Sequence, residues 1–389
     1  MKSWVLDDKD GSLTSGSDQP SLTPKAASVL KALIEQTGNV VSKEEILNQV
    51  WQGLHVSPDL VREYIFEIRQ AIGDKASEPL YIETVGRRGF RLIGPITLRS
   101  FLDTPKRPIK LPAVKYCQSK DGASIAHASS GDGYPLLFAG SWMTHLDMDW
   151  ESPAYGDYIR HLSNRFQVIR YDQRGNGLSQ WSDIDITFEG MVDDMEVIVD
   201  AYGFDQVAIL GMSQGASVAI AYALRHPERI SHLVLNGGYA QGRRQRRDPA
   251  AHEESKALVS LIRNSWGNEN PLVRQAFTTL FMPDASQEQM QWFNEFQRIC
   301  GPGENIAQFR ELFDNMNVTE MLPMVKIPTL VLHSDRDSVA PISEGKLLAS
   351  RIPGASFVQL NSPNHMLFEK EDDFPKMIEC IEAFIRSDD

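Results

Sequence analysis

The chain has 389 residues, of which 42% are hydrophobic and 23% charged, so it is too long for one ordinary core and has the composition of a globular protein. Its formal net charge of -13 argues against a general affinity for nucleic acid or anionic membranes, so any DNA contact must use a local basic patch. The chain has three widely spaced cysteines, which predicts a cytoplasmic protein without disulfides or a metal site, and we expect no cofactor. Its start is acidic and it lacks a run of about 18 apolar residues, so we expect neither a secretory signal nor a membrane span.

Capping residues and apolar spacing predict three helices, over residues 23–38, 42–51 and 57–73. Pro24 stands in the first turn of the first helix. Ser42 and Glu45 have the spacing of a capping box, and Ser57 is expected to cap the third helix. The apolar residues of the third helix recur every three or four positions and predict one buried face: Val61, Ile65, Ile68 and Ile72.

Two short strands are predicted next, over residues 80–85 and 90–94, joined by a Gly-Arg-Arg-Gly turn. Three helices followed by a hairpin with arginines at its tip is the layout of a winged helix-turn-helix. The strings "LTPKAASVLKALIEQTGNVVSKEEILNQVW" and "YIETVGRRGFRLIGP" resemble the OmpR/PhoB-type DNA-binding domain, in its CadC/ToxR-like form.

This resemblance implies that the third helix enters the major groove of DNA and that the hairpin, or wing, reaches the adjacent backbone. Arginine suits both tasks, because it pairs with guanine edges and with phosphates. The candidate DNA contacts are Arg62, Phe66, Arg69, Arg87 and Arg88. For Arg69 the alternative is a structural role at the edge of the core. Residues 1–105 hold 12 Lys or Arg and 14 Asp or Glu, so this domain is not basic, and we expect specific binding to promoter DNA to need a homodimer.

The proline-rich stretch "TPKRPIKLPAVK" predicts a linker over residues 98–112. The linker separates a winged-helix domain, residues 1–97, from a second domain, residues 113–389. In the second domain six nearly continuous apolar runs, such as "PLLFAG" and "VAILGMS", alternate with helical stretches. This alternation predicts an α/β fold with a mostly parallel sheet and helices on both faces.

The pattern "GMSQG" places Ser213 between Gly211 and Gly215, after a predicted strand over 207–210 and before a predicted helix over 215–224. The two glycines allow a sharp turn from strand to helix, which lifts the serine hydroxyl above the sheet. In this setting the pattern predicts a nucleophilic serine.

A nucleophilic serine needs a histidine base and an acid that orients it, and in this kind of fold they follow in the order serine, acid, histidine. His365 lies just after a late strand, where the base is expected, whereas His333 lies upstream of the acid. Asp337 precedes "SVAP" and is the preferred acid, whereas Asp335 is expected to stabilise the loop. We therefore predict a catalytic triad of Ser213, Asp337 and His365.

The oxyanion of such a reaction needs two backbone amide donors. One is expected at Gln214, and the other in the loop "AGSWMTH", at either Ser141 or Trp142. Residues expected to line the ligand pocket are Gly140, His145 and Met212.

The segment "YDQRGNGLS" is similar to a segment of α/β-hydrolases in which Asp172, Arg174 and Ser179 are structural. With the elbow serine, this resemblance to the α/β-hydrolase fold covers about residues 113–387. The string "FTTLFMPDASQEQMQWFNEFQR" is similar to the helical cap of a subgroup fused to helix-turn-helix or cyclase domains, so a cap is expected over about 240–322.

Two features of the cap have alternative interpretations. Its Met and aromatic residues either pack helices together or line an apolar ligand pocket. The run "GRRQRR", residues 242–247, is either a solvated surface, a guide for an anionic ligand or a contact for the DNA-binding domain.

Three functions stay open at this point. The first is a one-component transcription regulator whose hydrolase-like domain senses, and can hydrolyse, a small partly apolar molecule. The second is a serine hydrolase acting on an ester, lactone, thioester or carbon–carbon bond, with an N-terminal domain that only tethers or dimerises it. The third is an inactive hydrolase used as a receptor.

Overall fold

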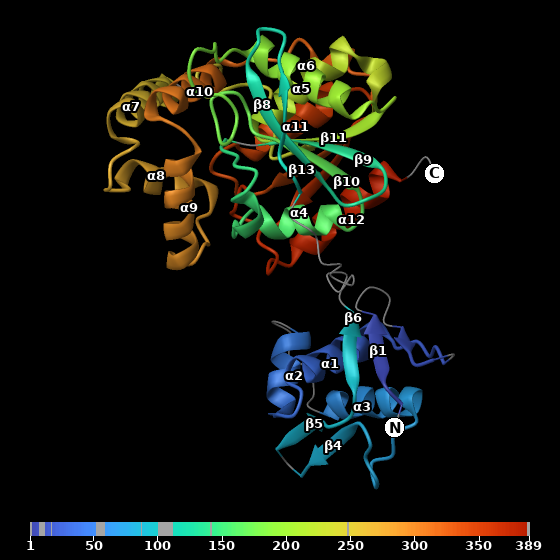
Figure 1. Cartoon of the computed structure of the whole chain (residues 1–389). Coiled ribbons are helices and arrows are strands. Elements are labelled where there is room, and N and C mark those ends of the chain that lie inside the picture. The colour runs from blue at the N-terminus through green and yellow to red at the C-terminus, as the bar shows by residue number, and fades with distance from the viewer. Residues whose placement is uncertain are drawn as a thin grey trace. The chain divides into compact units, whose positions relative to one another are not determined.

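The computed structural model describes most of the chain (Figure 1), namely residues 2–7, 12–16, 18–51, 59–86, 88–99, 112–140, 142–246 and 249–386. The chain divides into two compact units, Met1–Lys106 and Arg107–Asp389. Within the described ranges, every helix is too short or too polar to cross a lipid bilayer.

In the described part of the N-terminal unit there are three helices: α1 (Pro24–Glu35), α2 (Lys43–Val50) and α3 (Asp59–Ile72). Thr23 caps α1 by accepting a hydrogen bond from a backbone amide of the first turn. Ser42 and Glu45 form the predicted capping box before α2. The apolar stripe of α3 lies in the core of this unit. These observations confirm the three helices, although Ser57 and Pro58 lie outside the described residues.

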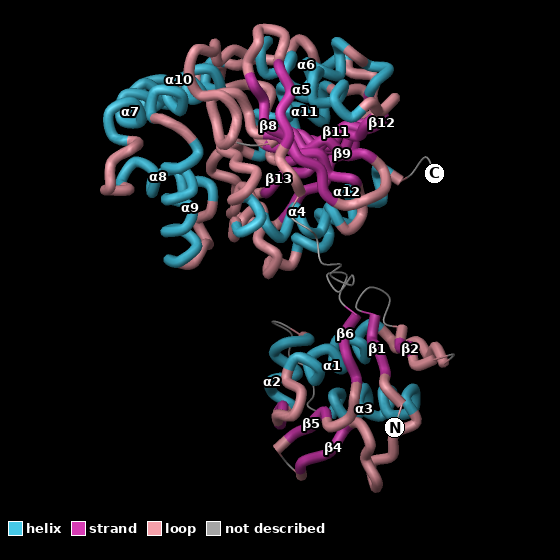
Figure 2. The backbone as a smooth tube through the Cα atoms, in the orientation of Figure 1, coloured by secondary structure: helices cyan, strands magenta, loops and turns pink. Residues whose placement is uncertain are grey.

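Two small sheets accompany these helices (Figure 2), with strand orders β2-β1-β6 and β3-β5-β4. Their strands are β1 (Trp4–Asp7), β2 (Leu13–Thr14), β3 (Val40–Val41), β4 (Ile82–Val85), β5 (Gly89–Leu92) and β6 (Ile96–Arg99). β4 and β5 are antiparallel and form the predicted hairpin. β1 pairs with β6 in parallel, a pairing that the sequence does not predict, and β6 runs two residues beyond the expected domain end at residue 97.

The C-terminal unit is built on a sheet that has eight strands within the described residues, in the order β14-β13-β12-β11-β9-β10-β8-β7. These strands are β7 (Lys115–Gln118), β8 (Ser124–Ser130), β9 (Pro135–Ala139), β10 (Gln167–Tyr171), β11 (Val207–Met212), β12 (Ile230–Asn236), β13 (Thr329–Ser334) and β14 (Ser356–Leu360). The pairs from β10 through β14 are parallel, whereas β8 is antiparallel to β10 and to β7. The strands β9 to β14 coincide with the six apolar runs, which confirms the mostly parallel sheet.

Helices cover both faces of this sheet (Figure 1). One face carries α5 (Phe188–Tyr202), α6 (Gln214–Arg225) and α11 (Ile342–Arg351), and the other carries α4 (Gly156–Ser163) and α12 (Asp373–Ile385). Short 3-10 turns lie at Asp149–Glu151, Pro227–Arg229 and Leu322–Met324. Between β12 and β13 the chain forms the helices of a cap: α7 (Pro249–Ser265), α8 (Leu272–Phe281), α9 (Gln287–Cys300) and α10 (Gly303–Asn315).

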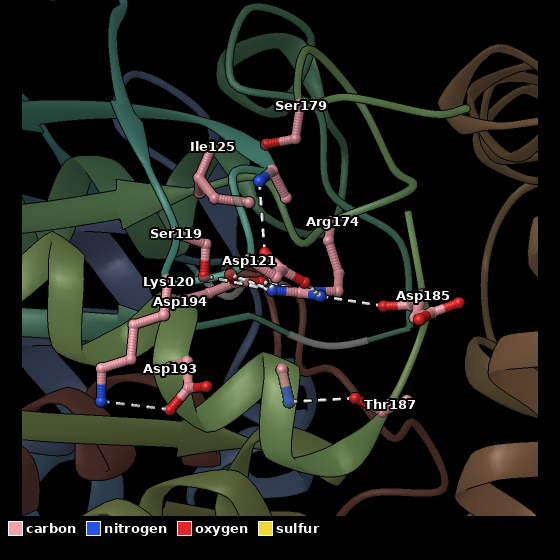
Figure 3. A network of polar contacts seen from close by, with 12 residues as sticks. Ser119, Lys120, Asp121, Ile125, Arg174, Ser179, Asp185, Thr187, Asp193 and Asp194 are labelled. Carbon is pink, nitrogen blue, oxygen red and sulfur yellow. Dashed lines mark hydrogen bonds and ion pairs between the residues drawn. The ribbon is translucent and has the colours of Figure 1, made fainter. Parts of the chain in front are cut away.

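A buried arginine holds together the loop that follows β10 (Figure 3). The guanidinium of Arg174 pairs with both carboxylate oxygens of Asp194 on α5, at 2.8 and 2.7 Å. It also donates to Asp121 at 2.6 Å and Ser119 at 3.1 Å in the turn between β7 and β8, and to the carbonyl of Asp185 at 2.8 Å. Burial works against the charge of Arg174, but these two carboxylates outweigh burial and raise its pKa. The expected structural role of Arg174 therefore has a physical basis in this network.

Replacing Arg174 with methionine is expected to lower the free energy of unfolding by about 3–5 kcal/mol, because Asp194 then stays buried without its counter-ion. The midpoint of urea unfolding, followed by tryptophan fluorescence and circular dichroism, measures this loss. Arg263→Met is the matched control, since its pair with Glu304 lies on the surface of the cap, and its midpoint is expected to be unchanged. Equal midpoints for the two variants would contradict the role assigned to Arg174.

Candidate DNA interface and candidate active site

The outward face of α3 carries an aromatic side chain, Phe66, close to basic side chains. Phe66 is 65% exposed, and Arg62 is exposed on the same helix. Both border a groove between α3 and the β4–β5 hairpin, and Lys43 lines the same groove. Arg88 is exposed at the tip of the hairpin, whereas Arg87 lies outside the described residues. The described candidates Arg62, Phe66 and Arg88 therefore lie at the surface, as a DNA contact requires.

Arg69 corrects one of our expectations, because the structure buries it to 9% exposure. Its guanidinium donates to the carbonyl of Ile82 at 2.6 Å and to the hydroxyl of Thr84 at 3.1 Å. Its Nε lies 3.6 Å from a carboxylate oxygen of Asp74, which in turn accepts three backbone amides at the start of β4. Arg69 therefore joins α3 to the wing, so its placement on the outward face is wrong and the structural alternative at the core edge describes it.

Ser213 connects β11 to α6 through a sharp turn, with φ of +55° and ψ of -125°. The flanking glycines allow this turn because neighbouring backbone approaches them closely. A Cβ at Gly215 would lie 2.4 Å from the carbonyl oxygen of Ala139, and a Cβ at Gly211 would lie 2.7 Å from the Cα of Ala216. The predicted setting of strand, turn and helix around Ser213 is confirmed.

His365 and Asp337 meet in the interior. The Nδ1 of His365 lies 2.6 Å from a carboxylate oxygen of Asp337, and both side chains are buried. A Cβ at Gly237 would lie 3.0 Å from the imidazole of His365, so this ring lies at the end of β12, the strand beside the one that carries Ser213. Among the described residues the Nε2 of His365 has no hydrogen-bond partner, so its bond to the Ser213 hydroxyl is not formed here. Such bonds are often long until substrate binds.

The Asp337 carboxylate is adapted to stay charged. Burial works to raise the pKa of Asp337, but the charges of His365 and His333 outweigh it and hold that pKa below its ordinary value. An ionised Asp337 keeps the proton on Nδ1 of His365 and leaves Nε2 able to accept one. Asp335 instead accepts the backbone amide of Ser362 at 3.1 Å, which supports the loop that precedes His365.

The family of the C-terminal unit follows from a family model for the alpha/beta hydrolase fold, which matches residues 134–372, more than half of the chain. The chain belongs to the α/β-hydrolase fold family. A second model, for the C-terminal domain of transcriptional regulatory proteins, matches residues 17–92. The N-terminal unit is therefore an OmpR/PhoB-type winged-helix domain, and the two resemblances read from the sequence are confirmed.

Relatives of the hydrolase domain include enzymes. The human serine hydrolase BPHL is 25% identical over 268 residues, which are 67% of this chain and 83% of the human protein. The AB hydrolase superfamily protein YisY of Bacillus subtilis is 23% identical over 261 residues, 66% of this chain and 94% of that protein. Among solved structures, an esterase from Exiguobacterium antarcticum has a TM-score of 0.61 at 21% identity, covering 70% of this chain and all of the esterase.

The loop that carries the oxyanion candidates, called the oxyanion loop below, is held at Gly140 by two side chains. Its carbonyl oxygen accepts the side-chain amides of Gln173, at 3.2 Å, and Gln214, at 3.4 Å. The backbone amide of Gln214 begins α6, where helix amides have no partner within the helix. Ser141 lies outside the described residues, so the choice between Ser141 and Trp142 for the second donor stays a prediction.

The side chain of Trp142 enters the cap of the hydrolase domain. Its ring stacks on Phe277 of α8, with 5.2 Å between the ring centroids and 21° between the planes. Trp266 and Phe313 pack edge-on against it at 6.2 and 6.4 Å. The loop that carries the oxyanion candidates is therefore anchored in the cap.

The cap also contacts the loop that carries His365, called the histidine loop below. Phe281, the last residue of α8, accepts the backbone amide of His365 at 2.9 Å, and its ring packs edge-on against the imidazole at 5.2 Å. Asn364 accepts the amide of Asp284 in the loop between α8 and α9. On α9, the ring of Phe296 stacks on those of Trp292 and Phe293, which favours helix packing as the role of these aromatic residues.

Of the three residues expected to line the ligand pocket, one borders a cavity in the described part of the chain. Gly140 lines a small cavity between the sheet and the helices α5 and α6, together with Gln214 and Gly215. Met212 is buried directly before Ser213, and the amide of His145 donates to Asp149. As far as the described residues show, neither Met212 nor His145 lines that cavity, so their contact with a ligand stays a prediction.

Sequence reasoning missed two groups that support the candidate site. His333, considered only as an alternative base, is fully buried, and its Nε2 lies 3.8 Å from Asp337 and 2.8 Å from the carbonyl of Ala340. Gln173 holds the Gly140 carbonyl. The only sequence signals are a histidine at the end of a buried strand and a glutamine inside "YDQRGNGLS".

Asp337→Asn is expected to slow the reaction of Ser213 with a fluorophosphonate probe about 10³- to 10⁴-fold, because the amide favours the wrong tautomer of His365. The rate of probe labelling measures this loss. Asp335→Asn, two residues away, is the matched control and should retain the rate of the parent chain. Comparable losses in both variants would remove the distinction between orienting acid and loop residue.

Arg69→Ala is expected to lower the stability of the winged-helix unit, whereas Arg62→Ala is expected to weaken its binding to DNA. Loss of Arg69 leaves the buried carboxylate of Asp74 without its counter-ion, so the winged-helix unit should unfold at a lower temperature. Loss of Arg62 should leave that temperature unchanged and weaken DNA binding, with a smaller dependence of affinity on salt. Thermal unfolding and gel-shift titrations at several salt concentrations separate the two effects. An unchanged melting temperature for Arg69→Ala would return this residue to the DNA-contact candidates.

Proposed function

We propose that this chain is a cytoplasmic one-component transcription regulator. Its winged-helix domain binds promoter DNA as a homodimer, and its hydrolase domain binds and hydrolyses a small, partly apolar molecule. The hydrogen bond between His365 and Asp337, at the end of the strand beside Ser213, carries the catalytic half of this proposal. The exposed face of Arg62 and Phe66 supports the DNA-binding half.

The arrangement suits acyl transfer. Ser213 Oγ attacks the carbonyl carbon of an ester, lactone or thioester, and its proton passes to Nε2 of His365. Asp337 stabilises the imidazolium that results. The Gln214 amide and the amide of Ser141 or Trp142 stabilise the negative charge on the carbonyl oxygen.

The second half of the reaction regenerates the enzyme. His365 gives its proton to the leaving oxygen or sulfur, the bond to the carbonyl carbon breaks, and the acyl group stays on Ser213. Water then attacks this acyl group and gives a proton to His365, which returns it to Ser213 as the acid departs.

A fluorophosphonate probe is expected to label the native chain at Ser213, because the probe reacts with serines activated by a histidine base. Ser213→Ala should abolish the labelling, and heat-denatured protein is the control for non-specific reaction. Mass spectrometry of the labelled peptide locates the modification. Absence of labelling in the native chain, with a probe as small as methyl fluorophosphonate, would favour an inactive receptor over a hydrolase.

The full chain is also expected to shift DNA taken from upstream of its own coding region, with protection over two half-sites. Footprinting with and without Ser213→Ala, together with a reporter gene, tests the regulatory half. A prolonged reporter response in Ser213→Ala means that hydrolysis ends the signal. Failure of the full chain to bind this DNA specifically would leave a serine hydrolase with a tethering domain as the better description.

A further inference from the structure

Four described arginines gather where the chain enters the cap. Arg243, Arg244 and Arg246 belong to the run "GRRQRR", and Arg310 lies on α10. This run is not a free surface, because residues 240–244 pair in an antiparallel manner with 314–318. The amide of Gly242 donates to Met316 at 2.7 Å, and that of Arg244 donates to Asp314 at 2.9 Å.

In this cluster the described arginines outnumber the buried carboxylates that pair with them. Asp314 pairs with Arg310 through two contacts, at 2.9 and 2.6 Å. Glu344 lies 3.7 Å from Arg246. Among the described residues, the carboxylate that Arg243 contacts belongs to the 67% exposed Glu254, also at 3.7 Å.

Like charges crowd Arg243 as a result. Burial lowers the pKa of Arg243, and the charges of Arg310 and Arg246 lower it further, whereas the charges of Asp314 and Glu254 act in the opposite direction. Within the described residues, four guanidinium groups thus face two buried carboxylates and one exposed carboxylate, and this surplus of positive charge favours the binding of an anion.

The surplus charge lies beside the elements that carry the catalytic groups. The guanidinium carbon of Arg310 is 6.0 Å from the ring centroid of Trp142 and 5.9 Å from that of Phe277. The guanidinium carbon of Arg246 is 5.6 Å from the ring of Tyr239. Trp142 belongs to the oxyanion loop, and Tyr239 follows by two residues the glycine that contacts His365.

A second observation at the same place points to a hydrogen-bond acceptor. Trp142 is 3% exposed, and within the described residues its indole Nε1 is a buried donor without a partner. A buried donor left unpaired costs about 1–3 kcal/mol, so such groups normally meet an acceptor. A carboxylate satisfies an indole N–H and a guanidinium together, because it accepts several hydrogen bonds and carries the missing charge.

We propose that Arg310, supported by Arg243 and Arg246, and the indole of Trp142 hold a carboxylate of the small molecule bound by the hydrolase domain. The apolar part of that molecule lies between this carboxylate and Ser213. The ligand class is therefore a half-ester or half-thioester of a dicarboxylic acid, with the free carboxylate at the arginines and the acyl carbon at Ser213. This inference rests on the proposed function of the site and names its ligand class.

Two matched substrates test this assignment: mono-4-nitrophenyl glutarate, and the 4-nitrophenyl ester of glutaramic acid, in which a neutral amide replaces the carboxylate. The full chain should favour the glutarate in kcat/KM by about 10- to 100-fold, the ratio expected for a charge-assisted hydrogen bond. Arg310→Gln and Arg243→Gln should each bring this ratio towards one, and Arg310→Lys should restore part of it. Arg263→Gln, on the exposed face of α7, is the control and should keep the ratio of the parent chain.

Binding by the Ser213→Ala chain provides a readout that does not need turnover. Isothermal titration should show tighter binding of heptanoate than of heptanamide, and Arg310→Gln should remove the difference. Turnover of both nitrophenyl esters at equal rates would overturn the inference, leave the hydrolase function intact and make the arginines structural only. No turnover, together with a preference for heptanoate, would overturn hydrolysis and support the carboxylate site. Equal binding of heptanoate and heptanamide would overturn the carboxylate site.

Discussion

The backbone of Ser213 has a positive φ, a conformation that costs a residue with a side chain about 1–3 kcal/mol and persists only where its surroundings enforce it. Here the enforcement comes from two hydrogen bonds, from the amide of Ser213 to Asn236 and from the amide of Ala216 to the carbonyl of Ser213. The close contact of Gly215 with the end of β9 completes it. Three parallel strands and the start of α6 thus converge on one residue.

Positive side chains form local groups in this chain although its net charge is -13. The winged-helix domain has an exposed cationic side chain beside an apolar ring on α3, and the cap has a cluster of guanidinium groups with too few buried carboxylates. The buried Arg174 of the same domain is instead matched by the carboxylates of Asp121 and Asp194. This contrast between Arg174 and the cluster is the basis on which we infer a binding role for the cluster.

The sequence predicted the features that depend on local pattern. The stripe from Val61 to Ile72 predicted the buried face of α3, and the two glycines around Ser213 predicted the elbow, because both follow from spacing along the chain. Arg69 was misplaced because its position borders that stripe, and its partners on β4 come from the tertiary fold. The pairing of β1 with β6 was missed for the same reason, since it joins residues about ninety positions apart.

The hydrogen bond from the His365 amide to the Phe281 carbonyl means that the cap also supports the catalytic candidate His365. An engineer who wished to change the ligand by exchanging the helices between β12 and β13 would also remove the acceptor and the aromatic ring that hold the histidine loop. The exchange would therefore alter the rate of reaction on every substrate, including those that fit the new cap well. A graft that retains the α8–α9 corner around Phe281 and replaces only α7 and α10 separates the choice of ligand from the support of the histidine.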